Sequence, residues 1–323
     1  EAETVAADIE RMTRDMAVFR RLETSGKPVA CAIEGTALGG GAELAMACHY
    51  RVAAHSEQVL LGLPEGGLGL LPGGGGTQRL PRLIGIQESL PILLQGVTKT
   101  AAEALKIGWV NEVAPVGQAI ERARKWVRET GDPVQPWDKP KFKVPGGGPY
   151  VQANSEALAM HAAMSRQKFY GNYPAQLHIL TALYEGIQVP FDAGLRIEMR
   201  EFIRTVRTPQ ALAMIRTSFL SPREIKSGAN RPAGVPVKTF KKATVLGAGL
   251  MGAGIACVQA QAGIETVLID RTQEAAERGK AYTATYLGKQ IKRGRMTQEK
   301  ADQILGRIVA TTDYSHVRGS DIV

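Results

Sequence analysis

The chain has 323 residues, a formal net charge of +9 and an apolar share of 44%. This length exceeds what one hydrophobic core usually supports, so it predicts at least two domains, and the composition excludes a chain that is disordered throughout. The lysines and arginines are mostly scattered. They form no basic stripe with interleaved aromatic residues, so nucleic acid is not an expected partner.

The cysteines and histidines indicate the redox state of the compartment and whether a metal site is expected. Cys31, Cys48 and Cys257 lie in apolar surroundings without a C-x-x-C pair, which predicts reduced thiols in a reducing compartment, and we expect a cytoplasmic protein. The five histidines lack the spacing of metal ligands, so no metal site is predicted. No signal peptide and no apolar run of about 18 residues occurs, so no transmembrane segment is expected.

The first residues already follow a helical pattern, and the last residues follow the pattern of a strand. Apolar residues recur at helical spacing from Ile9 to Leu22, which predicts an amphipathic helix that is already running near the first residue. The last residues, Asp321–Val323, resemble the start of a strand. We therefore expect an internal fragment of a longer protein, truncated at both ends.

The next elements predict a parallel sheet. Pro28–Ile33 and Tyr50–Ala54 are buried strands by composition, and a glycine-rich loop at 34–41 leads into a helix near 43–48 between them. A strand, loop, helix and strand in this order are the unit of parallel sheets. The pattern is helical over 86–129, which predicts a layer of helices over the sheet.

Two breaker-rich segments divide the rest of the chain. Gly131–Pro149 is dense in proline and glycine and predicts an extended surface connection, because neither helices nor strands tolerate that composition. Residues 151–218 are largely helical by pattern, and Arg231–Pro236 predicts a second linker.

The loop at 34–41 carries the first chemical signal. Gly39, Gly40 and Gly41 precede Glu43 at a predicted helix start, and a second carboxylate, Glu65, follows. Helix N-termini present free N–H groups that can stabilise an oxyanion, and two carboxylates in one cavity can share acid and base duties. A packing turn beside two surface glutamates explains the short motif equally well.

A wider match decides between these two interpretations. The matching runs are Lys27–Ala30, Gly35–Ala45, Gly62–Glu65 and Leu68–Arg82. From about Lys27 to Val113 the chain closely resembles the crotonase, or enoyl-CoA hydratase, family, whose substrates are acyl-CoA thioesters.

The resemblance implies a role for each of four residues. The Gly40 amide would be one of two oxyanion donors to the thioester carbonyl. Glu43 would position and activate water, Glu65 would exchange the proton at Cα, and Gly73 would help to shape the water site. The family takes its other oxyanion amide from an earlier Gly-Gly-Asp or Ala-Gly-Asp loop, which this sequence does not contain.

A dinucleotide-binding fingerprint follows the second linker. A short apolar strand, Ala243–Leu246, runs directly into Gly247, Gly249 and Gly252, and a helix comes next. In this context the first glycine permits the tight turn, the second lets a pyrophosphate approach, and the third allows close packing of helix on strand.

Neighbouring residues predict how the dinucleotide is held. The amides of Leu250 and Met251 should face the phosphates, because they open the helix. Asp270 ends the next strand near the spacing of roughly 20 residues expected for a carboxylate on the adenosine ribose. It would repel a 2′-phosphate and so favours NAD over NADP, although Arg271 beside it leaves NADP open.

The segment from Lys238 to Val323 resembles the start of a 3-hydroxyacyl-CoA dehydrogenase, with Gln290–Arg307 similar to its helical hairpin. The implied fold is α/β: a crotonase-like ββα spiral domain at 1–135, a proline- and glycine-rich connection with a helical linker at 136–237, and the first part of a Rossmann domain at 238–323. No catalytic residue of the dehydrogenase is predicted within the sequence.

The two resemblances together are typical of the multifunctional α subunits of fatty-acid β-oxidation. They imply hydration of a trans-2-enoyl-CoA, then NAD-dependent oxidation of the L-3-hydroxyacyl-CoA, with a thiolase β subunit as partner in a hetero-oligomer. Two alternatives stay open: a Δ3-Δ2-enoyl-CoA isomerase in which one glutamate does the chemistry, and a module that only binds CoA or NAD and assists assembly.

Overall fold

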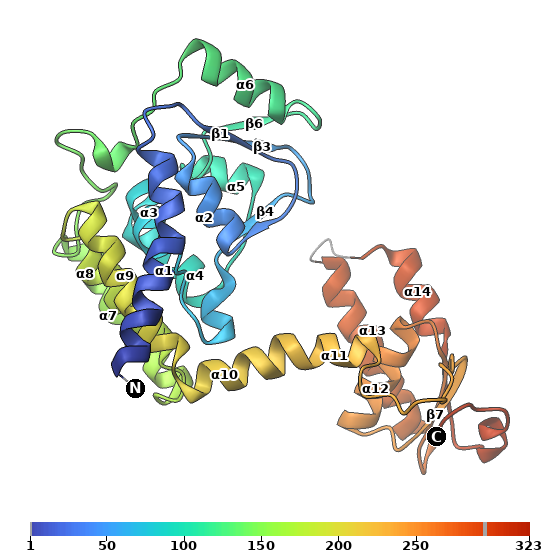
Figure 1. The fold of residues 1–323 in the computed structure, drawn as a ribbon. Helices are drawn as coiled ribbons and strands as arrows, with labels where there is room; N and C mark the ends of the chain where they lie inside the picture. Colours follow the sequence, from blue (N-terminus) through green and yellow to red (C-terminus); the bar gives the residue numbers. More distant parts are fainter. Residues whose placement is uncertain (1, 293–295) are drawn as a thin grey trace. The chain divides into compact units, whose positions relative to one another are not determined.

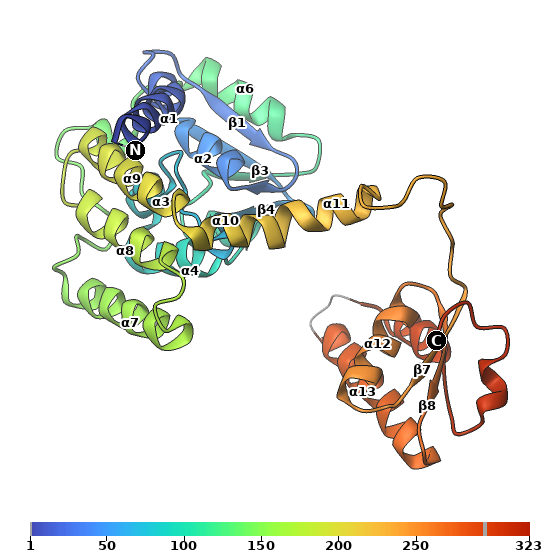
Figure 2. The same ribbon diagram turned by 60° about the horizontal axis from the view of Figure 1, so that its bottom comes forward.

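The chain folds into two compact units, Glu1–Asn230 and Arg231–Val323. A computed structural model describes residues 2–292 and 296–323 (Figures 1 and 2). No helix in this described part combines the length and the apolar character of a membrane span. The three-part division at residues 135 and 237 remains a prediction.

Two small sheets organise the N-terminal unit. The first is parallel, with the order β1 (Ala30–Ile33), β3 (Tyr50–Ala54) and β6 (Glu112–Ala114). The second has the order β2 (Ala37–Leu38), β4 (Leu60–Gly62) and β5 (Lys99–Thr100). The predicted parallel pair is confirmed by β1 and β3. The uniformly helical layer predicted for 86–129 is wrong in part, because β5 and β6 interrupt it.

Helices make up most of the rest of this unit. They are α1 (Ala2–Glu23), α2 (Gly40–Ala47), α3 (Gly76–Ile84), α4 (Ile86–Gln95), α5 (Ala101–Lys106), α6 (Ala119–Glu129), α7 (Gln152–Phe169), α8 (Ala175–Gly186), α9 (Phe191–Val206), α10 (Pro209–Ile215) and α11 (Ser221–Ser227). Short turns of helix lie at η1 (Pro64–Leu68), η2 (Pro136–Asp138) and η3 (Arg216–Leu220). The predicted opening helix is confirmed by α1.

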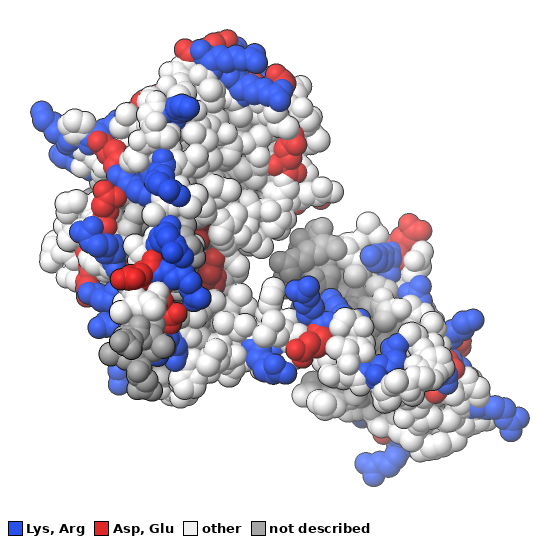
Figure 3. Space-filling model, viewed as in Figure 1, with Lys and Arg blue, Asp and Glu red and all other residues white. Residues whose placement is uncertain are grey.

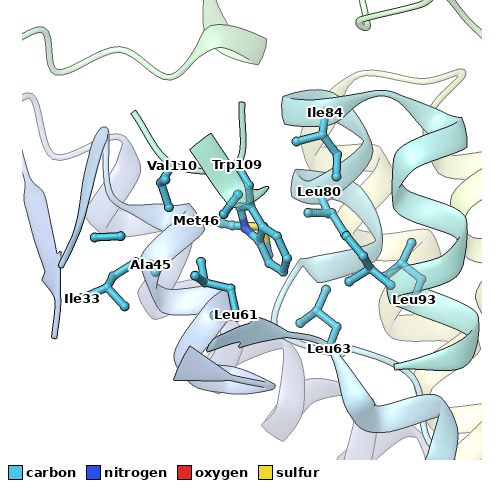
Figure 4. Packing of buried hydrophobic residues seen from close by; sticks show 14 of the residues in the cluster. Ile33, Ala45, Met46, Leu61, Leu63, Leu80, Ile84, Leu93, Trp109 and Val110 are labelled. Carbon is cyan, nitrogen blue, oxygen red and sulfur yellow. The ribbon is translucent and has the colours of Figure 1, made fainter. Parts of the chain in front are cut away.

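The core of this unit lies between α2, the strands and α3 and α4. Trp109 is its largest fully buried side chain, and Met46, Leu61 and Leu80 pack in the same cluster (Figure 4). Burying such side chains stabilises the fold by about 1.5–3 kcal/mol each. The core therefore fixes the start of α2, where the glycine turn lies.

The helices that follow residue 150 pack onto this core. Gln78 of α3 donates from Nε2 to the Ala182 carbonyl of α8 at 2.8 Å, and Arg82 donates to the Gly186 carbonyl at 2.9 Å. Burial lowers the pKa of Arg82 to about 10. These bonds join α8 firmly to α3, so part of the predicted linker region belongs to the N-terminal unit.

The connection at 131–149 is also less exposed than predicted. Gln135 is buried and donates to the Ala47 carbonyl at 3.0 Å, and the buried Trp137 stacks on Phe191 with ring centroids 4.9 Å apart. The prediction of an extended surface connection is wrong at these two residues, because their side chains fill gaps beside α2 and α9.

The C-terminal unit begins a Rossmann fold. Its parallel sheet has the order β7 (Lys242–Leu246), β8 (Glu265–Ile269) and β9 (Ile308–Thr311), and its helices are α12 (Leu250–Gln261), α13 (Gln273–Lys292) and α14 (Gln298–Gly306), with a short turn at η4 (Tyr314–Val317). Ile322 bridges to Ala243 in parallel, as the predicted final strand requires. The predicted hairpin at 290–307 includes residues 293–295, which lie outside the described residues.

Charges are mixed on the surface of the N-terminal unit. On the face shown in Figure 3, basic and acidic side chains lie interspersed. The described residues contain no group of three His, Cys, Asp or Glu side chains that could hold a metal ion.

Candidate active site

Glu43 lies in the first turn of α2, directly after the glycine turn, and only 4% of it is exposed. Its Oε1 atom accepts hydrogen bonds from the Gly74 and Gly76 amides, both at 2.8 Å. Burial raises the pKa of this carboxyl group, while the two amide bonds and the nearby Arg79 act in the opposite direction. Glu43 is therefore a fixed carboxylate with one oxygen, Oε2, free of those amides.

Glycine is required where the loop meets Glu43. A Cβ atom at Gly74 would lie 2.6 Å from Glu43 Oε2, and one at Gly76 would lie 2.8 Å from Oε1. Contacts this short force a shift of the neighbouring atoms. The run of glycines at 73–76 therefore lets the backbone itself approach the Glu43 carboxylate.

Glu65 lies in η1, and its carboxylate reaches back to the same glycine turn. A Cβ atom at Gly39 would lie 2.7 Å from Glu65 Oε1. The Oε2 atom is buried and accepts no hydrogen bond from the described residues. Burial, and then the charge of Glu43, raise the pKa of Glu65 to about 7.

Gly40 and Gly73 take different places at this site. Gly40 is the first residue of α2 and is exposed, so its amide belongs to the N–H groups that a helix leaves unsatisfied. Gly73 lines a cavity of about 250 Å³ between α1, α9 and the glycine loop. A Cβ atom there would lie 2.5 Å from the Phe202 ring. Close packing is thus one reason for this glycine, and its role in a water site stays a prediction.

The structure adds residues that the sequence did not single out. Glu198 of α9 is 1% exposed and accepts hydrogen bonds from the Gly75 and Thr77 amides. Arg79 donates to the Gly74 carbonyl at 2.6 Å and forms a buried ion pair with Glu23 of α1 at 2.7 Å. No local pattern could single out these contacts, because Glu198 lies 123 positions from Gly75 and Arg79 lies 56 positions from Glu23.

The glycine turn of the C-terminal unit has the geometry that the fingerprint predicts. Gly247 has φ +97°, a region that favours glycine. A Cβ atom at Gly252 would collide with the Gly247 carbonyl oxygen, whereas nothing lies within 4 Å of the corresponding position at Gly249. The third glycine thus serves packing, and the second faces open space where a pyrophosphate could approach.

The helix start beside this turn is accessible. Leu250 and Met251 begin α12 and are 81% and 77% exposed. Asp270 follows β8 and accepts hydrogen bonds from the Ala248 amide at 2.6 Å and the Arg271 amide at 2.7 Å. These two amides hold the pKa of Asp270 below its usual range. A carboxylate beside a glycine turn and an open helix N-terminus fits a dinucleotide.

Two family matches agree with these two sites. Residues 3–135 match the family described as enoyl-CoA hydratase/isomerase, and residues 242–323 match the NAD-binding domain of 3-hydroxyacyl-CoA dehydrogenase. The predicted fold class, a crotonase-like unit followed by the start of a Rossmann NAD-binding domain, is confirmed.

Relatives share both segments in one chain. The fatty acid oxidation complex subunit alpha of Shewanella amazonensis is 37% identical over 95% of this chain and 43% of its own length, and that of Shewanella loihica is 38% identical over the same shares. A solved enoyl-CoA hydratase from Bacillus anthracis is 28% identical over 70% of this chain and 69% of that chain, with a TM-score of 0.36. The chain spans less than half the length of these two subunits. The chain thus contains a segment of the enoyl-CoA hydratase/isomerase family followed by the start of a 3-hydroxyacyl-CoA dehydrogenase NAD-binding domain, and over 95% of its length it is similar to fatty acid oxidation complex alpha subunits.

Proposed function

We propose that the N-terminal unit supplies the hydratase site of a protein that adds water to a trans-2-enoyl-CoA. The observation that carries this proposal is the pair of carboxylates at one glycine turn, with Glu43 buried and Glu65 half-buried. Glu43 is held by two amides, whereas Glu65 has a bare buried oxygen and a pKa raised to about 7. Two carboxyl groups with such different surroundings can take the base and acid roles at neutral pH.

The proposed reaction assigns one step to each group. Ionised Glu43 takes a proton from water while the water oxygen bonds to C3 of the enoyl thioester. The electrons of the C2–C3 double bond move toward the thioester, and the Gly40 amide stabilises the negative charge on its oxygen. Protonated Glu65 gives its proton to C2. The site is restored when the proton on Glu43 passes, directly or through solvent, to Glu65.

For the C-terminal unit we propose NAD as cofactor. The amides of Leu250 and Met251 would face the pyrophosphate, Gly249 would allow its close approach, and Asp270 would accept hydrogen bonds from the adenosine ribose. Bound NAD supplies the hydride acceptor for oxidation of an L-3-hydroxyacyl-CoA. The negative charge of Asp270 supports NAD over NADP, because it would repel a 2′-phosphate.

The partner and the compartment are part of the same proposal. A thiolase β subunit in a hetero-oligomer would consume the 3-ketoacyl-CoA, and this partner is supported by the similarity of the chain to subunits of fatty acid oxidation complexes. A cytoplasmic location is supported by three unpaired cysteines, of which Cys48 and Cys257 are buried. Co-purification of a thiolase with the full-length protein tests the partnership.

Glutamine variants of the full-length protein test the hydratase assignment. Glu43→Gln and Glu65→Gln should each lower the rate of enoyl-CoA hydration by about 10²–10⁴-fold, because each removes one proton-transfer group. The matched control is Glu57→Gln, which changes an exposed glutamate of the same unit and should leave the rate unchanged. Isomerisation of an enoyl-CoA that depends mainly on one of the two glutamates, in a protein whose wild type does not hydrate, would favour the isomerase. Binding of acyl-CoA and NAD in calorimetry without turnover by the wild type would favour the binding module.

A further inference from the structure

A third buried carboxylate faces the glycine loop from the opposite side. Glu198 lies on α9, 123 positions from Gly75 in the chain, and is 1% exposed. A buried carboxylate must be compensated by partners, since an isolated charge in the interior costs several kcal/mol. The hydrogen-bond donors to Glu198 in the described structure all come from the loop, as two backbone amides and the Thr77 hydroxyl.

The two carboxylates share the loop amides in strict alternation. The Gly74 and Gly76 amides donate to Glu43 Oε1, both at 2.8 Å. The Gly75 amide donates to Glu198 Oε1 at 2.6 Å, and the Thr77 amide donates to Glu198 Oε2 at 2.9 Å. The Thr77 hydroxyl adds a third bond to Oε2 at 2.5 Å. Successive amides of residues 74–77 therefore point to opposite sides.

This alternation couples the two side chains mechanically. Residues 74–77 could rotate only if the Gly75 and Thr77 amides left Glu198. Because the peptide planes are rigid and consecutive, such a rotation would also turn the Gly74 and Gly76 amides away from Glu43. Arg79 holds the same segment by one carbonyl, that of Gly74. Among the residues that the structure describes, Glu198 alone accepts hydrogen bonds from the amides on the side away from Glu43.

We propose that Glu198 is a positioning residue of the hydratase site, which holds residues 74–77 so that the Gly74 and Gly76 amides bind Glu43. The inference rests on the proposed hydratase function and extends it to α9, a helix that carries no part of the crotonase motif. It also gives the helices after residue 150 a part in the site.

The charges around Glu198 agree with this role. The charged groups that interact with it are Glu43 of α2 and Arg79 and Arg82 of α3. Burial, and then the charge of Glu43, raise the pKa of Glu198 to about 8, while Thr77, Arg79 and Gly75 oppose the shift. Two carboxylates therefore share one short segment of backbone, and the loss of either would leave buried amides without acceptors.

Two variants of the full-length protein and one control test the proposal. Glu198→Ala removes both acceptor oxygens, and Glu198→Gln keeps the size of the side chain and one acceptor. The control is Glu201→Gln, one turn along the same helix, where an equally buried glutamate binds His178, Arg200 and Arg204 instead of the loop. A general weakening of α9 would affect the control as well.

For Glu198→Ala we expect kcat for hydration to fall by about 10- to 100-fold, as misplacement of reacting groups by about 1 Å can do, with KM changed by less than about threefold. The kcat of Glu198→Gln should lie between that of Glu198→Ala and that of the wild type. The acidic limb of the kcat/KM profile should move to higher pH, since Glu43 would lose two amides that stabilise its ionised form. Unchanged kcat, or an acidic limb that stays or moves to lower pH, would overturn the proposal.

Hydrogen exchange separates this proposal from the proposed function. The amides of residues 74–77 should exchange faster in both Glu198 variants than in the wild type and the Glu201→Gln control. A wild type that does not hydrate an enoyl-CoA would refute the hydratase function, whether or not exchange changes. A wild type that hydrates, with Glu198 variants that match it in rate and in exchange, would refute the positioning role alone.

Discussion

At the scale of single residues, the two carboxylates of the candidate site differ in their contacts. Glu43 sits where glycines let two backbone amides reach one oxygen, whereas Glu65 lies beside Gly39 with a buried oxygen that no described residue binds. The sequence singled out Glu43 because it directly follows the glycine turn, and the resemblance to the crotonase family singled out Glu65 farther along the chain. Neither could predict Glu198, whose partners are backbone amides far away in the chain.

The pH dependence of hydration follows from Glu65. Its pKa is raised to about 7, so the group carries the proton that C2 needs below this pH and loses it above. We expect kcat/KM to fall as the pH rises through about 7, and to fall again at low pH as Glu43 becomes protonated. Initial rates across the pH range check this profile. A rate that stays level from neutral to strongly basic pH would remove Glu65 from the acid role.

A buried ion pair beside the site should contribute strongly to stability. Glu23 and Arg79 are paired at 2.7 Å with side-chain exposures of 0% and 1%. Glu23→Gln leaves the guanidinium buried without its partner, so the free energy of unfolding should fall by about 3–5 kcal/mol. Urea unfolding measures this change. Glu121→Gln breaks the exposed pair with Arg124 and serves as the control, with an expected change of about 0–1 kcal/mol.

At the scale of elements, the hydrophobic patterns predicted helices and strands better than they predicted which of these elements pack together. The parallel pair β1 and β3 was predicted from two short apolar runs. The predicted burial holds for most of β3, whereas three of the four residues of β1 are only half-buried. The short strands β5 and β6 were hidden in a pattern that is helical around them. The packing of α8 on α3 depends on Gln78 and Arg82 meeting carbonyl groups, and periodicity contains no information about such pairs.

The turn between β7 and α12 gives a prediction for cofactor binding. A Cβ atom at Gly252 would collide with the Gly247 carbonyl oxygen, so Gly252→Ala should displace the helix start and weaken NAD binding by about tenfold or more. Calorimetric titration with NAD measures the effect. Gly254→Ala lies in the same helix with open space at its Cβ position, and it should bind NAD like the wild type. Equal affinities in the two variants would contradict this role of the turn.

At the scale of the whole molecule, two compact units carry two chemically distinct sites, each formed within its own unit. The N-terminal unit would produce an L-3-hydroxyacyl-CoA, and the protein that contains the C-terminal unit would oxidise it. Chemical order, hydration before oxidation, thus matches the order of the two units along the chain. The two activities should therefore be separable by substitution at either site.

A coupled assay of the full-length protein tests this account most directly. Wild type, Glu43→Gln and Glu65→Gln are each given a trans-2-enoyl-CoA and NAD, and the loss of the enoyl absorbance and the formation of NADH are followed together. We predict both signals in the wild type and neither in the variants, with NADH formation restored in the variants when L-3-hydroxyacyl-CoA is supplied directly. An enoyl signal that persists in the wild type, or NADH formed from enoyl-CoA by both variants, would contradict the account.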